Sequence, residues 1–213
     1  MLPLLDSAEV RVLGALIEKE ATTPEYYPLS LNALVNACNQ KSNREPVVDY
    51  DDETVLAAIE GLREKRLTLI VKGSGRVTKY SQRLSETLNL GRRELAVICT
   101  LLLRGQQTLG EIKDRSERIF AFADLAEAER LLQKLEEPPD GPLVRKLARQ
   151  PGQKEVRYAH LLSGGPAPLA ANDKPSSIEA PSRVSTLERE LQALRGDFEE
   201  LKRRFNELEA QLR

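Results

Sequence analysis

The apolar residues near the start of the chain follow a helical spacing, and the same pattern returns in the middle of the chain. Residues 9–17 read EVRVLGALI and residues 94–102 read ELAVICTLL. In both segments the apolar positions recur near i, i+3, i+4 and i+7, which is typical of an amphipathic helix. Asp6 and Glu9 have the spacing of a capping box at the start of the first segment. We therefore predict a helix at each place.

A short second helix and then a third helix are predicted after each of these segments. The second helix begins at Ser30 in one copy and at Thr108 in the other, where Glu111 again gives a capping-box spacing. The third begins after Asp51 and after Asp124. Aligned at these two aspartates, the third helices share apolar positions, pairing Ile59 with Leu132 and Leu62 with Leu135.

Each copy then ends in a predicted β-hairpin. Glycine in the turn and β-branched residues in the arms are typical of hairpins. The arms are residues 67–71 and 77–80 in the first copy, and 143–149 and 156–158 in the second. Three helices followed by a hairpin is the element order of a winged helix-turn-helix. The fold class we predict is mainly α with small β-hairpins (α+β), built as two tandem winged-helix domains and a C-terminal coiled-coil helix.

The predicted domain boundaries follow from these patterns. Residues 1–88 form the first winged-helix domain and residues 89–162 the second. Residues 163–181 combine four prolines with glycine, serine and alanine, a composition that indicates a disordered linker. Residues 182–213 follow as the coiled-coil helix.

The coiled coil is predicted from a heptad repeat, in which apolar residues alternate at spacings of three and four. Its seam consists of Leu187, Leu191, Leu194, Phe198, Leu201, Phe205, Leu208 and Leu212. In a parallel pair, Glu190 would face Arg195 and Asp197 would face Lys202 of the partner, whereas an antiparallel pair brings like charges together. We expect a parallel self-association, most simply a dimer, with a trimer left open. The alternative is a single amphipathic helix packed on the globular part.

Charge is distributed unevenly along a chain whose net charge is only −1. This balance excludes a general polycation, so any nucleic-acid binding must come from a local patch. Basic residues gather on the hairpins, and the candidate phosphate contacts are Lys72, Arg76, Lys79, Arg83, Arg145, Lys146, Arg149, Lys154 and Arg157. Basic wings suit contacts to the phosphates of double-stranded DNA. Equally, lysine and arginine protect exposed strand edges from aggregation.

The third helices carry the opposite charge. Asp51, Asp52 and Glu53 open the first of them, at the end that approaches base edges in helix-turn-helix readers. Acidic residues also simply stabilise helix N-termini. The acids count against deep insertion into a major groove, and they favour a second hypothesis in which the protein is an adaptor that binds a partner polypeptide.

A polar loop separates the second and third helices of the first copy. Its candidate recognition residues are Asn39, Gln40, Lys41, Asn43 and Arg44. These side chains can hydrogen-bond a base, a phosphate or a partner loop. They can equally satisfy the backbone of a long surface loop.

A family resemblance covers about residues 5–162. Residues 22–55, TTPEYYPLSLNALVNACNQKSNREPVVDYDDETV, resemble the signature of the YceH-like family of uncharacterised bacterial proteins. The segments EGLREKRL at 60–67 and LGRRELAVICTLLLRG at 90–105 extend the likeness. The resemblance implies a tandem winged-helix fold, without an activity, substrate or functional residue to carry over.

Catalytic and cofactor chemistry is not expected. The sequence contains no nucleotide-binding or nucleophile-elbow motif. Two cysteines, Cys38 and Cys99, and one histidine, His160, do not make a zinc site. We predict buried structural thiols and a surface histidine. Because neither a signal peptide nor an apolar stretch of membrane-spanning length occurs in this sequence, the expected protein is a non-catalytic, cytoplasmic one without a membrane partner.

Overall fold

A computed structural model describes residues 3–72, 77–138, 141–149, 153–164 and 202. The predicted linker, apart from its first two residues, and the coiled-coil seam lie outside the described residues. The features below therefore concern the part of the chain before residue 165.

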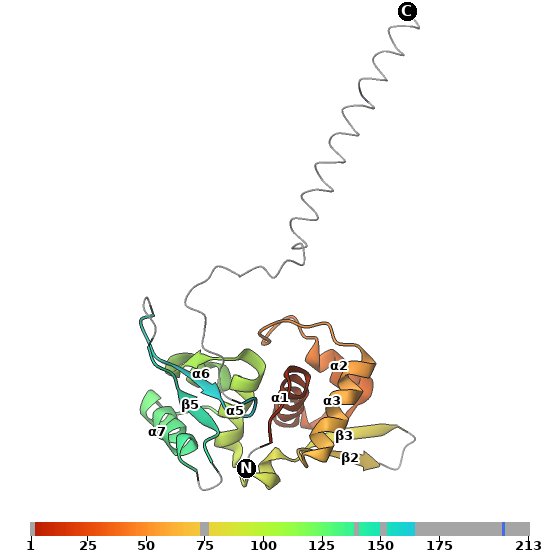
Figure 1. Cartoon of the computed structure of the whole chain (residues 1–213), viewed down its shortest axis with the longest axis horizontal. Helices are drawn as coiled ribbons and strands as arrows, with labels where there is room; N and C mark the ends of the chain where they lie inside the picture. Colours follow the sequence, from red (N-terminus) through yellow and green to blue (C-terminus); the bar gives the residue numbers. More distant parts are fainter. Residues whose placement is uncertain (1–2, 73–76, 139–140, 150–152, 165–201, 203–213) are drawn as a thin grey trace, which may run out of the picture. The chain divides into compact units, whose positions relative to one another are not determined.

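The structure contains two copies of one element order (Figure 1). The first copy consists of α1 (Ser7–Thr22), α2 (Leu31–Cys38), α3 (Asp52–Glu64), β2 (Thr68–Lys72) and β3 (Thr78–Gln82). The second consists of α5 (Arg92–Arg104), α6 (Leu109–Ser116), α7 (Leu125–Glu136), β5 (Val144–Lys146) and β6 (Arg157–His160). This confirms the predicted fold class of helices with small antiparallel hairpins.

The predicted helix starts are also confirmed. Both capping boxes form, at the N-termini of α1 and α6. The Asp51 carboxylate accepts a hydrogen bond from the backbone N–H of Thr54 at 2.8 Å, and that of Asp124 from Glu127 at 2.7 Å. Each cap satisfies a backbone donor that has no partner inside its helix, which explains why the local sequence fixes these boundaries.

Each hairpin gains a third strand that the sequence analysis did not predict. β1 (Leu29–Ser30) pairs with β3, and β4 (Gln107–Thr108) pairs with β6, giving the orders β1-β3-β2 and β4-β6-β5. The two sheets correspond residue by residue, since Tyr80 and Tyr158 occupy equivalent, buried places on the central strands. Two short helices were also not predicted, η1 (Pro24–Tyr26) and α4 (Leu84–Thr87).

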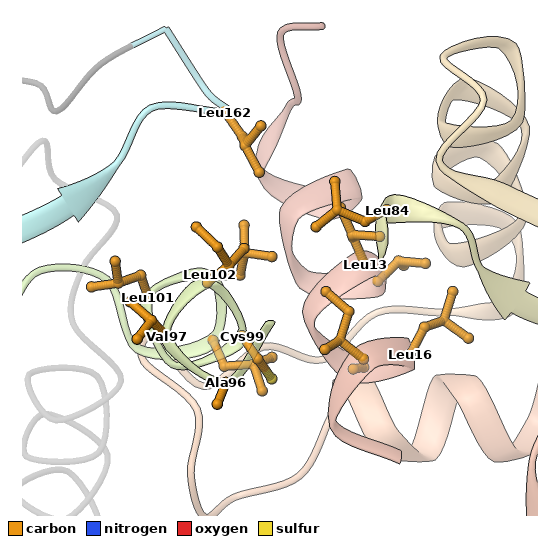
Figure 2. Close-up of a cluster of buried hydrophobic side chains, with 14 of the residues drawn as sticks. Leu13, Leu16, Leu84, Ala96, Val97, Cys99, Leu101, Leu102 and Leu162 are labelled. Atoms are coloured by element: carbon orange, nitrogen blue, oxygen red, sulfur yellow. The ribbon is translucent and has the colours of Figure 1, made fainter. Parts of the chain in front are cut away.

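The two copies share one hydrophobic core. Figure 2 shows Leu13 and Leu16 of α1 in the same buried cluster as Ala96, Cys99 and Leu102 of α5. The buried side chains form a single cluster that continues from one copy into the other. The predicted boundary at residue 88 falls between α4 and α5, but packing is continuous across it.

Helices α1 and α5 approach each other closely at Gly14 of α1. The Cys99 thiol donates a hydrogen bond to the Gly14 carbonyl oxygen, with 3.4 Å between the heavy atoms. A Cβ placed on Gly14 would stand only 2.8 Å from Cδ2 of Leu103. The absence of a side chain at Gly14 is therefore what allows the two helices to pack this closely.

Among the described residues, no helix has the length and apolar character needed to cross a membrane.

Candidate nucleic-acid interface

The β5–β6 hairpin presents the most accessible of the predicted basic residues. Arg145, Lys146, Arg149 and Lys154 are exposed, and no ion pair joins any of them to another described residue. The Arg149 Nε donates to the Gln153 carbonyl at 2.6 Å, and this acceptor is a neutral group. Four cations on one short ribbon form a surface that can receive a phosphate backbone.

Arg157, on the same hairpin, is engaged within the fold. Its Nη1 lies 3.2 Å from Oε2 of Glu111 and donates to the Gln106 carbonyl at 2.9 Å. Glu111 also caps α6 through the backbone N–H of Thr108. Arg157 therefore ties β6 to the start of α6 and is less available to an external anion than its neighbours.

The first hairpin, β2–β3, has fewer accessible basic side chains among the described residues. Arg83 pairs with Glu86 at 3.1 Å, and Lys79 is half-buried. Lys72 ends β2, and Arg76 lies outside the described residues. The second hairpin is consequently the better candidate surface.

The polar loop mostly serves its own structure. The Asn39 side-chain amide forms two hydrogen bonds with the backbone of Tyr50. It donates to the Tyr50 carbonyl oxygen at 2.7 Å and accepts from the Tyr50 N–H at 2.8 Å. Arg44 is buried, with its Nη2 2.6 Å from Oε2 of Glu18 and a further bond to the Ala37 carbonyl. Asn43 accepts a hydrogen bond from Arg104. These contacts support the interpretation of a self-satisfied surface loop.

Gln40 and Lys41 are the predicted loop residues for which no hydrogen bond to another described side chain or backbone group occurs. Gln40 is half-buried and Lys41 is exposed. Of the predicted loop residues, we therefore expect Lys41 to be the one that contacts an external ligand.

A second buried arginine holds this loop, and the sequence analysis did not single it out. Arg11 of α1 donates to the carbonyl oxygens of Cys38, at the end of α2, and of Pro46, within the loop. Burial, and then the nearby Arg44 guanidinium, lower the pKa of Arg11. An arginine inside an amphipathic segment normally faces solvent, so only the fold revealed this role.

The exposed face of α3 is acidic. Asp51, Asp52, Glu53, Glu60 and Glu64 are all exposed along it. Hydrogen bonds from Thr54 lower the pKa of the Asp51 carboxyl. This face repels a polyanion.

The groups considered for chemistry are poorly placed for it. Cys38 and Cys99 are buried, as predicted, and burial raises the pKa of the Cys38 thiol to about 12. His160 is partly buried, so its interpretation as a surface residue is wrong. Burial lowers the pKa of His160 to about 4, and its Nδ1 has no hydrogen-bond partner among the described residues. The described ranges also hold no group of three or more histidine, cysteine or acidic residues arranged for a metal ion.

Fold and surface together define a class: a small protein with two similar helical units, one shared core and an exposed basic hairpin. The model of the family described as "Protein of unknown function, DUF480" matches residues 5–153, and the chain belongs to this family. A UPF0502 protein of Solibacter usitatus is 54% identical over 94% of this chain and 98% of its own length. One of Pelobacter propionicus is 50% identical over 98% of both chains.

The predicted resemblance to YceH-like proteins is confirmed by a further relative. The UPF0502 protein YceH of Escherichia fergusonii is 44% identical over 98% of this chain and 97% of its own length. The names of the family and of these relatives state no catalytic activity.

Proposed function

We propose that this chain is a non-catalytic, cytoplasmic protein whose two copies are winged-helix units, and that it associates with double-stranded DNA through the β5–β6 hairpin. The observation that carries the proposal is the exposure of Arg145, Lys146, Arg149 and Lys154 without ion pairs among the described residues. Cations of this kind bind phosphates with little dependence on base sequence.

The acidic face of α3 defines how contact would occur. A winged helix that reads bases inserts its third helix into the major groove. Here Asp52 and Glu53 occupy the leading end of that helix. The proposed contact is therefore led by the wing, with the third helix held away from the phosphates.

Self-association completes the proposal. The predicted heptad seam of residues 182–213 would join two copies in parallel and so present two basic hairpins to one duplex. Two linked weak contacts bind more tightly than either alone, because the second becomes intramolecular.

DNA binding by the full chain is expected to weaken steeply with salt, because neutralised phosphates release counterions. Replacing Arg145, Lys146 and Arg149 with alanine should lower affinity and flatten the slope of log K against log salt by about one unit per lost phosphate contact. Fluorescence anisotropy with a labelled duplex at several salt concentrations measures both quantities.

A charge-matched control uses three exposed arginines outside the hairpin. Arg63, Arg93 and Arg130 lie on α3, α5 and α7. Their combined replacement with alanine removes the same charge and should leave the salt slope nearly unchanged. Equal effects of the two triple variants, or no binding at about 50 mM salt, would refute wing-led DNA binding.

For the tail, we expect light scattering on the full chain to give a multiple of the single-chain mass. Replacing Leu194 and Leu201 with lysine places charges at two seam positions and should yield the single-chain mass. The control variant Gln192→Lys with Glu199→Lys changes positions outside the seam and should remain associated. A full chain that already scatters as one copy would disprove self-association.

The second candidate function is that of an adaptor for a partner polypeptide. The specific observation in its favour is the acidic face of α3, on which the exposed Leu56 offers an apolar contact between carboxylates. Such a surface suits a basic, partly apolar peptide segment. Absence of duplex binding at low salt would make this candidate the stronger one.

A further inference from the structure

A cavity of about 300 Å³ lies where the two copies meet. Its walls come from α1, from the polar loop at Asn43, from α5 and from α6 together with residues 117–119. The first two belong to the first copy and the last two to the second. Sites for small organic molecules begin at roughly this volume and often lie at such junctions.

Arg104, at the end of α5, is the most conspicuous charge in this cavity. Its hydrogen bond goes to the neutral amide oxygen of Asn43. Within the described part of the chain, no carboxylate forms an ion pair with it. A half-buried guanidinium without a carboxylate partner is costly unless something else compensates its charge.

A second guanidinium, that of Arg115 on α6, lines the same cavity. Burial, and then the nearby Arg115 guanidinium, lower the pKa of Arg104, whereas the Glu18 and Glu45 carboxylates raise it. Arg115 pairs with Glu111 at 3.2 Å and donates a hydrogen bond to the side-chain oxygen of Gln107. The same Glu111 carboxylate also pairs with Arg157, so Arg104 and Arg115 together retain an excess of positive charge.

The acidic groups of the cavity do not cancel this excess. Glu18 forms a two-bonded ion pair with Arg44. The Arg44 Nη1 lies 3.2 Å from Oε1 of Glu18, and the Arg44 Nη2 lies 2.6 Å from Oε2. Asp114 and Glu117 are exposed, so they stand where the cavity meets solvent and are well hydrated. The partly buried charges that remain are thus those of Arg104 and Arg115, and the exposed charges of the lining are of both signs.

We propose that this cavity binds a small organic anion, whose carboxylate or phosphate group is held by the guanidinium groups of Arg104 and Arg115. Guanidinium groups bind such planar or tetrahedral anions through paired N–H donors. The volume admits one small metabolite and excludes a peptide or an oligonucleotide. Because the bound molecule touches both copies, it would strengthen their junction, and this role does not depend on DNA binding.

The test uses the full chain with two anions and their neutral counterparts. Succinate is compared with succinamide, and glycerol 3-phosphate with glycerol, by titration calorimetry and thermal unfolding. We expect saturable binding and a raised Tm for at least one anion, since a ligand of the folded state shifts unfolding, and neither effect for the neutral molecules. Which anion binds better distinguishes a carboxylate ligand from a phosphate ligand.

Variants locate the site. Arg104→Gln and Arg115→Gln should each weaken binding about tenfold or more, the usual effect of losing a charge-assisted hydrogen bond. Arg130→Gln removes an exposed charge on α7 outside the cavity and should bind as the parent does. Should Arg104→Gln fail to fold by circular dichroism, Arg115→Gln decides the matter. No saturable binding of either anion up to about 10 mM, or unchanged affinity in the folded cavity variants, would overturn the proposal.

Discussion

Replacing Gly14 with valine is expected to lower the free energy of unfolding by about 3 kcal/mol. A Cβ at this position would approach Leu103 to 2.8 Å and Leu102 to 3.2 Å, and both leucines are buried. Helix α1 would have to move away from α5, which opens the shared core along its length. The modest gain in helix propensity over glycine, about 1 kcal/mol or less, does not offset this.

Urea denaturation followed by circular dichroism measures the loss. The matched control is Gly110→Ala on α6, where nothing lies within 4 Å of the added Cβ. That variant should be neutral or slightly stabilising. If Gly14→Val unfolded at the same urea concentration as the parent, the close packing of α1 on α5 would be contradicted.

Replacing Arg44 with alanine is expected to cost about 3–5 kcal/mol of stability, the usual result of breaking a buried ion pair. The Arg44 side chain is fully buried and the Glu18 side chain is 12% exposed. Without Arg44, the Glu18 carboxylate has little water to replace the lost partner. The carbonyls of Ala37 and Asn43 lose their donor at the same time.

An exposed ion pair provides the comparison. Arg63 lies 2.7 Å from Glu60, with about half of each side chain exposed, and Arg63→Ala should cost less than about 1 kcal/mol. The pair of variants also separates the two interpretations of the polar loop. A ligand contact at Arg44 predicts weakened binding with stability unchanged, whereas the structural role predicts the large loss of stability. Two equal, small losses would contradict the structural role.

The local sequence determined the helices and their starts. Asp6, Thr108, Asp51 and Asp124 satisfy backbone donors within one turn of themselves, so their effect does not depend on distant residues. The apolar matches between the two third helices were equally reliable, since Ile59, Leu62, Leu132 and Leu135 are all buried. A helical stripe must face a core whatever that core contains.

The candidate site could be predicted only in part. The sequence identified the basic hairpins. The structure shows which of their basic residues are exposed and which are paired within the fold. Arg145 and Lys146 are exposed, while Arg157 is paired with Glu111, 46 residues earlier in the chain. That pairing brings β6 beside α6, and the order of residues along the chain gives no sign of it. The predicted contacts at Arg76 and along the heptad seam lie outside the described residues and stay predictions.

By itself, then, the sequence determined a helical protein with two repeated units, their caps and their basic ribbons, because these depend on neighbours a few residues apart. Tertiary structure alone decided that β1 and β4 complete the sheets. A strand of two residues is too short to show the alternation of apolar and polar residues that predicts a strand. Tertiary structure also decided that α1 and α5 join the two units in one core, that Arg11 and the loop residue Arg44 are buried, and that Arg104 and Arg115 line a common cavity. Each of these depends on residues far apart in sequence, whose meeting is set by the packing of whole elements.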